Sequence, residues 1–223
     1  MRDRAEELRR RVEERIRFLS DLGAGFVFRV EKKEPDKASV LQALEEAVRR
    51  CTLCPLSARR GHAVPGEGSY ETPLMFVGEA PGADEDTLGR PFVGRAGQLL
   101  TKIIAAMKFK REDVYITNVV KCRPPDNRTP LRPEVEACQP YLLTQIKTIR
   151  PRVIVSLGKT ATDFFVPSSA GMTSLRGDFH DFGSIRVMPT FHPSYVMRNE
   201  GDPSIKRLVW QDMKKVMALL GEK

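Results

Sequence analysis

Four cysteines of this chain have the spacing of a metal or cluster site. Cys51 and Cys54 form a C-x2-C pair, and Cys122 and Cys138 follow as two remote single cysteines. Cysteine thiolates bind structural zinc in tetrahedral sets of four, and they also hold iron–sulfur clusters. Disulfides are not expected, because the chain is predicted to belong to a reducing compartment. The spacing alone leaves zinc and an iron–sulfur cluster equally open, with scattered buried cysteines as a third interpretation.

A glycine-rich turn with a nearby aromatic residue follows the first predicted strand, in VGEAPGADEDTLGRPFVGRAGQLL. Gly78, Pro81 and Gly82 predict a tight turn off the strand end, where backbone amides form a pocket floor and Glu79 adds a carboxylate. Phe92 lies outside any apolar periodicity, so it is either a loop anchor or a platform that stacks on a planar ligand. The turn matches neither the dinucleotide fingerprint nor the P-loop, and an inert acidic loop is the alternative.

An asparagine and a histidine end two further predicted strands. The amide of Asn118 offers a donor and an acceptor side by side, as the edge of a nucleobase requires. His192, in FHPSYVMR, has no partner spaced for zinc binding, and from the sequence alone it is either a structural turn residue or a functional group. The cations near Asn118 either contact phosphate or form an ordinary charged surface; they are Lys121, Arg123, Arg128 and Arg132.

These residues are positioned by alternating strands and helices. The apolar patterns predict strands over 74–78, 114–120, 153–158 and 185–190, and helices over 39–50, 94–108, 133–150, 159–165 and 203–220. Such alternation is typical of an α/β fold, here a three-layer α/β/α sandwich with a central four-stranded parallel sheet. Sites in these folds gather at the carboxyl ends of the strands, which would bring GEAPG, Asn118, the LGK segment and FHPS together.

The chain is predicted to comprise an N-terminal helical extension and linker over 1–38 and one domain over 39–223. The extension is either a solvated appendage or a partner-binding helix; its apolar stripe consists of Leu8, Val12, Ile16 and Leu19. No apolar run approaches a membrane span and the N-terminus is charged, so we expect a cytoplasmic protein without a signal peptide. The net charge of +8 favours a polyanionic partner such as DNA or RNA, although it also serves solubility.

Several ordered motifs together resemble one enzyme family. GEAPG, GRPFVGRAGQLL, TNVVKCRPP-x-NR-x-P and HPSYVMR, with the four-cysteine pattern, look like a family 4 uracil-DNA glycosylase, one of the iron–sulfur uracil glycosylases of bacteria and archaea. The resemblance covers about residues 39–220. It implies hydrolysis of the N-glycosidic bond of uracil in single- or double-stranded DNA by base flipping, which leaves an abasic site and starts base-excision repair. It also implies a monomer with a structural 4Fe–4S cluster on the four cysteines.

The resemblance assigns a role to each residue of the base pocket. Gly78 and Ala80 would form its floor, Phe92 would stack on uracil, and Asn118 would pair with O4 and N3–H, where cytosine would mismatch. Glu85 would crowd the 5-position and reject thymine. His192 would hydrogen-bond the charge developing on O2, and Glu79 would orient water or stabilise the cationic sugar.

On the DNA side, the resemblance implies that Ser194 contacts a phosphate and that Val196 and Met197 wedge into the gap left by the flipped base. Arg198 and Arg123 would hold the DNA backbone. Two alternatives stay open from the sequence: a binding module of the same fold without catalysis, and a specificity for another deaminated base such as hypoxanthine or xanthine.

Departures from related families refine these expectations. In the family 1 motif G-Q-D-P-Y, Glu79 stands at the glutamine, Ala80 at the catalytic aspartate and Gly82 at the thymine-screening tyrosine, so the family 1 aspartate has no carboxylate counterpart at its own position. Family 5 enzymes usually lack an acid at the Glu79 position. The histidine-bearing insertion of the uracil-crosslinking variant is absent, so we expect ordinary turnover.

Overall fold

The computed structural model describes residues 36–221 together with Arg10 and Glu14. The chain divides into two units, Met1–Pro35 and Asp36–Lys223, each considered by itself. The helix predicted over residues 1–20 and the linker after it lie, apart from Arg10 and Glu14, outside the described residues. The helix predicted from residue 39 begins earlier, at Lys37, because Asp36 caps it: a carboxylate oxygen of Asp36 accepts the Ser39 backbone N–H at 2.9 Å.

Four parallel strands form the centre of the sheet, as predicted. They are β2 (Leu74–Gly78), β3 (Tyr115–Asn118), β4 (Val153–Leu157) and β6 (Ile185–Thr190), arranged in the order β3-β2-β4-β6. The strand register places Gly78 beside Asn118 and Leu157 beside Thr190, so the carboxyl ends of all four strands meet at one edge. This edge holds the site.

The prediction of only four strands was incomplete, because two short antiparallel strands flank the parallel ones. They are β1 (Glu67–Gly68), which pairs with β3, and β5 (His180–Phe182), which pairs with β6. Neither strand contains a buried residue, so neither leaves an apolar signal in the sequence. The described sheet therefore has six strands in the order β1-β3-β2-β4-β6-β5.

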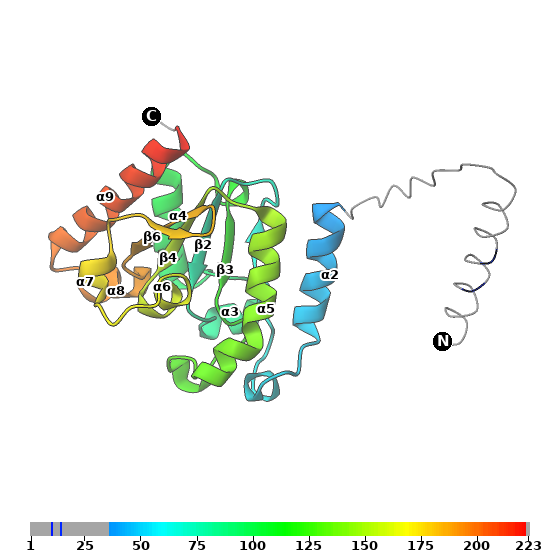
Figure 1. Ribbon diagram of the computed structural model, residues 1–223. Coiled ribbons are helices and arrows are strands. Elements are labelled where there is room, and N and C mark those ends of the chain that lie inside the picture. The colour runs from blue at the N-terminus through cyan, green and yellow to red at the C-terminus, as the bar shows by residue number, and fades with distance from the viewer. Residues whose placement is uncertain (1–9, 11–13, 15–35, 222–223) are drawn as a thin grey trace, which may run out of the picture. The chain divides into compact units, whose positions relative to one another are not determined.

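Helices cover both faces of the sheet (Figure 1). Alternate residues of β2 point to opposite layers. Met75 and Val77 pack with α2 (Lys37–Arg49), α5 (Arg132–Ile149) and α6 (Lys159–Phe165). Leu74 and Phe76 pack with α4 (Arg95–Ala106) and α9 (Pro203–Leu220). The three-layer prediction is confirmed. None of the helices between residues 36 and 221 is long and apolar enough to span a membrane.

Short helices and turns connect these layers at the site edge. The described residues add α3 (Ala83–Leu88), α7 (Met172–Leu175) and α8 (Pro193–Arg198), which the sequence patterns did not predict. Three 3-10 turns span Pro55–Ala58, Arg111–Asp113 and Pro125–Asn127. Helices of four to six residues are too short to show a full amphipathic period, so their apolar residues give no clear signal.

Candidate functional site

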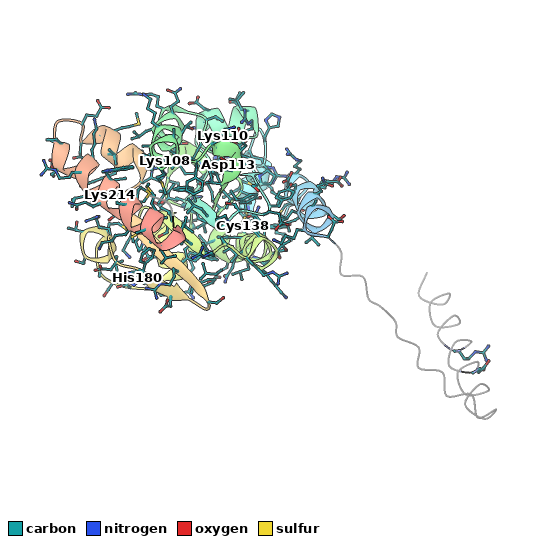
Figure 2. All side chains as sticks on the ribbon, turned by 90° about the horizontal axis from the view of Figure 1, so that it is seen from above. Lys108, Lys110, Asp113, Cys138, His180 and Lys214 are labelled. Atoms are coloured by element: carbon teal, nitrogen blue, oxygen red, sulfur yellow. The ribbon has the colours of Figure 1, made fainter. Side chains whose placement is uncertain are left out.

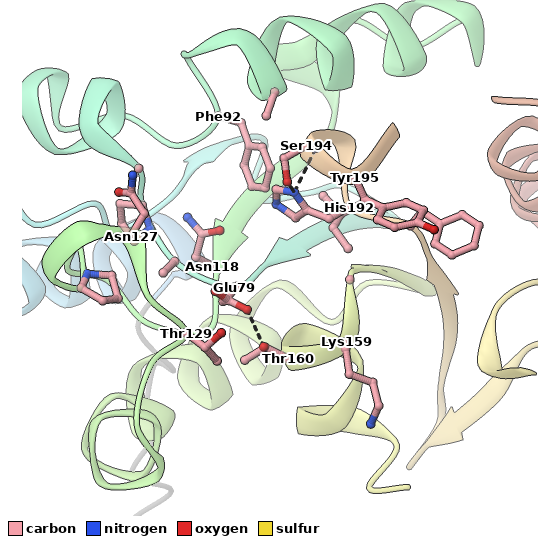
Figure 3. A pocket seen from close by; sticks show the side chains of 18 of the residues that line it. Glu79, Phe92, Asn118, Asn127, Thr129, Lys159, Thr160, His192, Ser194 and Tyr195 are labelled. Carbon is pink, nitrogen blue, oxygen red and sulfur yellow. Dashed lines mark hydrogen bonds between the residues drawn. The ribbon is translucent and has the colours of Figure 1, made fainter. Parts of the chain in front are cut away.

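A cavity of about 750 Å³ opens at the carboxyl ends of the parallel strands (Figure 3). Its walls come from all four segments that were expected to converge there. They contribute Glu79, Ala80 and Glu85 after β2, Asn118 at the end of β3, Gly158 and Lys159 after β4, and His192, Ser194 and Arg198 after β6. Phe92, from the loop before α4, completes the group.

Asn118 places an unsatisfied acceptor beneath an aromatic ring. Its side chain is 1% exposed, and its Oδ1 atom has no hydrogen-bond partner among the described residues. A Cβ on Gly78 would lie 2.5 Å from this Oδ1 and 2.5 Å from Cζ of Phe92, so only glycine lets both side chains approach here. Buried polar atoms are nearly always paired, so an orphan acceptor facing a cavity marks a place for a donor.

A strained backbone holds the Phe92 ring. Phe92 is buried and adopts a left-handed φ of 51°, which is uncommon outside glycine and asparagine. Its carbonyl oxygen packs so closely on Gly97 that any Cβ there would clash with it. The loop is therefore fixed before any ligand enters.

Glu85 ties this loop to the glycine-rich turn. One carboxylate oxygen accepts the backbone N–H groups of Val93 and Gly94, both at 2.9 Å, and the other accepts Gly82 N–H at 3.1 Å. The sequence did not predict that Glu85 binds these backbone N–H groups, because partners three to nine residues away give no periodic signal. Glu85 also lines the cavity.

His192 is neutral and its tautomer is fixed. As the N-cap of α8 it accepts the Ser194 backbone N–H at Nδ1, over 3.1 Å. Because a backbone N–H can only donate, Nδ1 carries no proton and the proton of the neutral ring lies on Nε2. Burial, together with the positive charge of Arg198, lowers the pKa of His192 to about 4, and the negative charge of Glu85 opposes the shift. The ring centroid lies 5.8 Å from that of Phe92.

Two hydroxyl groups contact the side chains of His192 and Glu79 in this cavity. The Ser194 hydroxyl lies 2.7 Å from His192 Nδ1, so in this structure it contacts the imidazole. The Thr160 hydroxyl, at the start of α6, donates to a carboxylate oxygen of Glu79. Thr160 was not predicted, although its place directly after LGK at a strand end was a usable signal.

Val196, one of the two residues predicted to wedge into the base stack, is only 2% exposed. It packs with Phe191, Ile205 and Val209 in a core cluster. Its neighbour Tyr195 is instead 39% exposed and lines the cavity. Met197 is half-buried.

Tyr195 rests on a fixed support. Its ring stacks on Phe191 with the centroids 4.9 Å apart and an interplanar angle of 27°. The guanidinium of Arg176 lies over the Phe191 ring, 5.9 Å from its centroid, and Arg176 also forms an ion pair with the fully buried Asp212. The stack ends at the rim of the cavity.

The cations near Asn118 separate into different roles. Lys121 is 1% exposed and faces inward, so it is neither a phosphate contact nor a surface charge. Arg123 does not line the cavity, but its Nε donates to Asn127, which does. Arg128 lines the cavity and binds Glu134 through two hydrogen bonds, whereas Arg132 is exposed and paired with Glu136.

All four cysteines line a second, small pocket between α2, α5 and the segment after β3. None forms a disulfide. Cys138 is 8% exposed and lies inside the body of the domain (Figure 2). Three sulfurs accept hydrogen bonds: Cys122 from Arg60 at 3.1 Å, Cys138 from Lys121 N–H at 3.3 Å and Cys51 from Leu53 N–H at 3.5 Å.

The chemistry of these sulfurs suits ligands of a cation. Burial raises the pKa of the Cys122 thiol, and it raises the pKa of Cys138 to about 11, so a bound cation would be needed to keep these thiolates deprotonated. A hydrogen bond to Cys51 is the main cause that raises the pKa of Tyr141 to about 12. Within the described residues, no group of three or more Cys, His, Asp or Glu side chains is arranged to hold a metal ion.

Comparison with known proteins connects this geometry to one superfamily. Residues 65–214 match the family model of the uracil DNA glycosylase superfamily. A type-4 uracil-DNA glycosylase of Thermotoga maritima is 48% identical over 82% of this chain and 96% of its own length, and one of Saccharolobus solfataricus is 44% identical over 82% and 88%. A type-5 uracil-DNA glycosylase of Pyrobaculum aerophilum is 32% identical over 66% and 73%.

Proposed function

This chain belongs to the type-4 uracil-DNA glycosylases, and we propose that it hydrolyses the N-glycosidic bond of uracil in DNA. The product is an abasic site, from which base-excision repair begins. One observation carries the assignment to this cavity: the orphan Oδ1 of Asn118 lies beneath the Phe92 ring at the end of β3. A planar ligand with an N–H on its edge satisfies both groups.

Uracil has the edge that Asn118 requires. Its N3–H donates to Oδ1, while the side-chain NH2 group donates to O4, and Phe92 covers the face of the base. Cytosine carries an acceptor at N3 and a donor at C4, so both pairings fail. A site built around a hydrogen-bonded edge rejects such an analogue strongly, because the buried polar groups are left unpaired. The target base must leave the duplex to reach this edge, so the reaction requires base flipping.

His192 stabilises the leaving group. Cleavage leaves negative charge on the uracil ring and positive charge on the sugar. The neutral imidazole, with its proton on Nε2, donates a hydrogen bond to O2 as charge develops there. The Ser194 backbone N–H keeps the ring in this tautomer, so no proton has to be rearranged during the reaction.

Glu79 acts on the sugar side of the same cavity. Thr160 holds one carboxylate oxygen, which restricts the rotamer of the side chain. A carboxylate fixed at the cavity wall stabilises the cationic sugar or orients the attacking water. Tyr195, which lines the cavity, and the half-buried Met197, rather than Val196, would fill the gap in the base stack. Arg198 also lines the cavity and provides positive charge for the DNA backbone.

The four cysteines fit a 4Fe–4S cluster with a structural task. Cys51, Cys54, Cys122 and Cys138 would hold it, and the N–H···S contacts are the outer contacts that stabilise such ligands. When bound, the cluster supplies a cross-link between α2, the segment after β3 and α5.

The decisive experiment is a cleavage assay with matched oligonucleotides. The purified protein is incubated with single- and double-stranded DNA containing uracil, then treated with alkali, which breaks the strand at abasic sites. We expect cleavage at uracil and none at cytosine or thymine in the same sequence. Hypoxanthine and xanthine in that position test the other deaminated bases. Tight binding of uracil DNA without cleavage at any salt concentration would establish a binding module instead.

A further inference from the structure

Lys121 lies between the cysteine pocket and the residue proposed to recognise uracil. It directly precedes Cys122, and its backbone N–H donates to the Cys138 sulfur at 3.3 Å. Its side chain turns in the other direction, and its ammonium donates to the backbone carbonyl oxygen of Asn118 at 2.7 Å. One residue therefore contacts both sites of the domain.

Each N–H bond of the Lys121 ammonium has a hydrogen-bond acceptor. Besides Asn118, it donates to the Thr117 hydroxyl at 2.6 Å and to Gln145 Oε1 at 2.8 Å. Thr117 gives its own proton to the Pro65 carbonyl at 2.8 Å, so toward Lys121 it acts as an acceptor. Three acceptors match the three N–H bonds of an ammonium group. Lys121, Thr117 and Gln145 are each at most 1% exposed.

The same residue docks helix α5 against the end of β3. Cys138 and Gln145 lie seven residues apart on α5, which is about two turns, so they share one face of the helix. Lys121 contacts the first through its backbone and the second through its side chain. Gln145 also donates to the Pro65 carbonyl at 2.8 Å and to the Tyr115 hydroxyl at 3.0 Å, so the helix, the strand and the preceding loop share one buried polar network.

We infer that Lys121 is a positioning residue that transmits the geometry of the four-cysteine site to Asn118. This inference rests on the proposed function. The cysteines fix the backbone at Lys121, and the buried ammonium fixes the end of β3 at the distance that places Asn118 Oδ1 beneath Phe92. Because misplacement of a recognition group by about 1 Å can cost on the order of a hundredfold in rate, a buried contact of this kind can set uracil affinity without touching the base.

The test compares Lys121→Met with Ser156→Ala in the full chain. Methionine keeps the volume and apolar stem of the side chain but removes all three donors. Ser156 is fully buried in β4 and its hydroxyl lies 2.9 Å from that of Thr162, so its loss removes a buried hydrogen bond outside the Lys121 network. For each protein, four quantities are measured: iron content, melting temperature, affinity for free uracil and affinity for DNA with an abasic site.

We expect Lys121→Met to retain its iron and its affinity for abasic DNA, while its affinity for uracil falls about tenfold or more. Ser156→Ala should bind uracil with the affinity of the wild type, even if its melting temperature falls as much as that of Lys121→Met. Wild-type uracil affinity in Lys121→Met would overturn the inference. So would an equal loss in Ser156→Ala, since general loosening would then explain both.

A second variant covers the case in which Lys121→Met does not fold. Gln145→Leu removes one acceptor of the ammonium and leaves Lys121 in place, so we expect a smaller loss of uracil affinity with the iron retained. No loss in Gln145→Leu would contradict the inference. Failure of the proposed function can be distinguished from failure of this inference. In the first case, the wild-type protein itself neither cleaves uracil DNA nor binds uracil.

Discussion

At the scale of single residues, Asn118 combines a buried acceptor without a partner and an open cavity beside it. Such an atom destabilises the free protein, because burial has removed its water and no protein donor replaces it. A ligand that brings an N–H recovers this loss on binding. The register that pairs Gly78 with Asn118 makes the arrangement possible, since any larger residue at Gly78 would occupy the space of the acceptor and of the Phe92 ring.

Replacement of Asn118 by leucine should therefore separate activity from stability. We expect kcat/KM on uracil DNA to fall by roughly 10² or more, because two hydrogen bonds to the base are lost. The melting temperature should be unchanged or higher, since an unpaired polar atom is removed. Single-turnover kinetics and thermal unfolding measure the two effects. A large fall in melting temperature with the activity retained would show that Asn118 has a structural role.

The contribution of His192 to the pH dependence of activity follows from its low pKa of about 4. The neutral donor persists at pH 5 to 8, so the acid limb of single-turnover activity due to this residue should appear near pH 4 and not near 6.5. Protonation places a proton on Nδ1 and breaks its bond from Ser194 N–H. NMR titration of the imidazole gives the pKa directly. A titration midpoint near 6.5 would contradict the fixed neutral tautomer.

The stability of the fold should decrease as the pH falls from about 6.5 toward 4, because of His192. The unfolded chain takes up a proton at His192 near pH 6.5, whereas the folded chain does so only near pH 4. The contribution of the neutral ring is fully present above pH 6.5 and is lost as the pH falls toward 4. We expect His192→Gln to show a smaller loss of melting temperature between pH 7 and pH 5 than the wild type. Equal losses in the two proteins would contradict this linkage.

At the scale of elements, neighbouring residues of the six-residue helix α8 have different structural roles. His192 caps it, Pro193 starts it, Val196 anchors it in the core, and Tyr195 is turned to the rim of the cavity. The stack of Phe191 behind Tyr195 fixes the ring before DNA arrives. A pre-ordered aromatic ring loses little conformational entropy when it stacks on a base.

Tyr195→Ala should weaken the reaction on duplex DNA more than on single strands, because only the duplex retains a gap that must be filled after flipping. We expect KM for duplex substrate to rise roughly tenfold, in line with about 1–3 kcal/mol per stacked base. Tyr195→Phe should retain most of the function. Trp210→Ala is a matched control, since Trp210 is 36% exposed and does not line the cavity. An equal effect of the two alanine variants would show that Tyr195 makes no specific contact.

At the scale of the whole domain, the cysteine site joins segments that are distant in sequence. Cys51 and Cys54 follow α2, Cys122 follows β3 and Cys138 lies in α5, so a cluster shared by these cysteines would constrain the chain over residues 51–138. The sheet has its own apolar core on both faces, so a cluster bound at the cysteines would add to a fold that already has a packed interior.

Removal of the cluster should lower the melting temperature without abolishing the fold. We expect a fall of at least about 5 °C, since each kcal/mol shifts the midpoint of a domain of this size by about 2–4 °C. The iron is removed with a chelator, and the loss of absorption near 400 nm, iron content and thermal unfolding are followed together. Stoichiometric zinc in a colourless protein would show that the site holds zinc. Loss of iron with an unchanged melting temperature would exclude a structural task.

The central architecture could be predicted because it depends on local patterns. Four buried strands of apolar residues, with helices between them, predicted the parallel sheet, and the rule for carboxyl ends brought Glu79, Asn118 and His192 together before the structure was known. The edge strands could not be predicted, because two or three half-exposed residues have no apolar period.

The amino-acid sequence by itself determined the family, the layers and the place of the cavity, since these follow from motifs and from periodicity along the chain. Only the tertiary structure decided that Val196 is buried and Tyr195 exposed, and that Lys121 faces inward between two sites. In both cases partners from another element help to set the side chain's environment: Val209 of α9 for Val196, and Gln145 of α5 for Lys121. Burial and hydrogen bonding depend on which elements pack against each other, and a local sequence pattern does not contain that information.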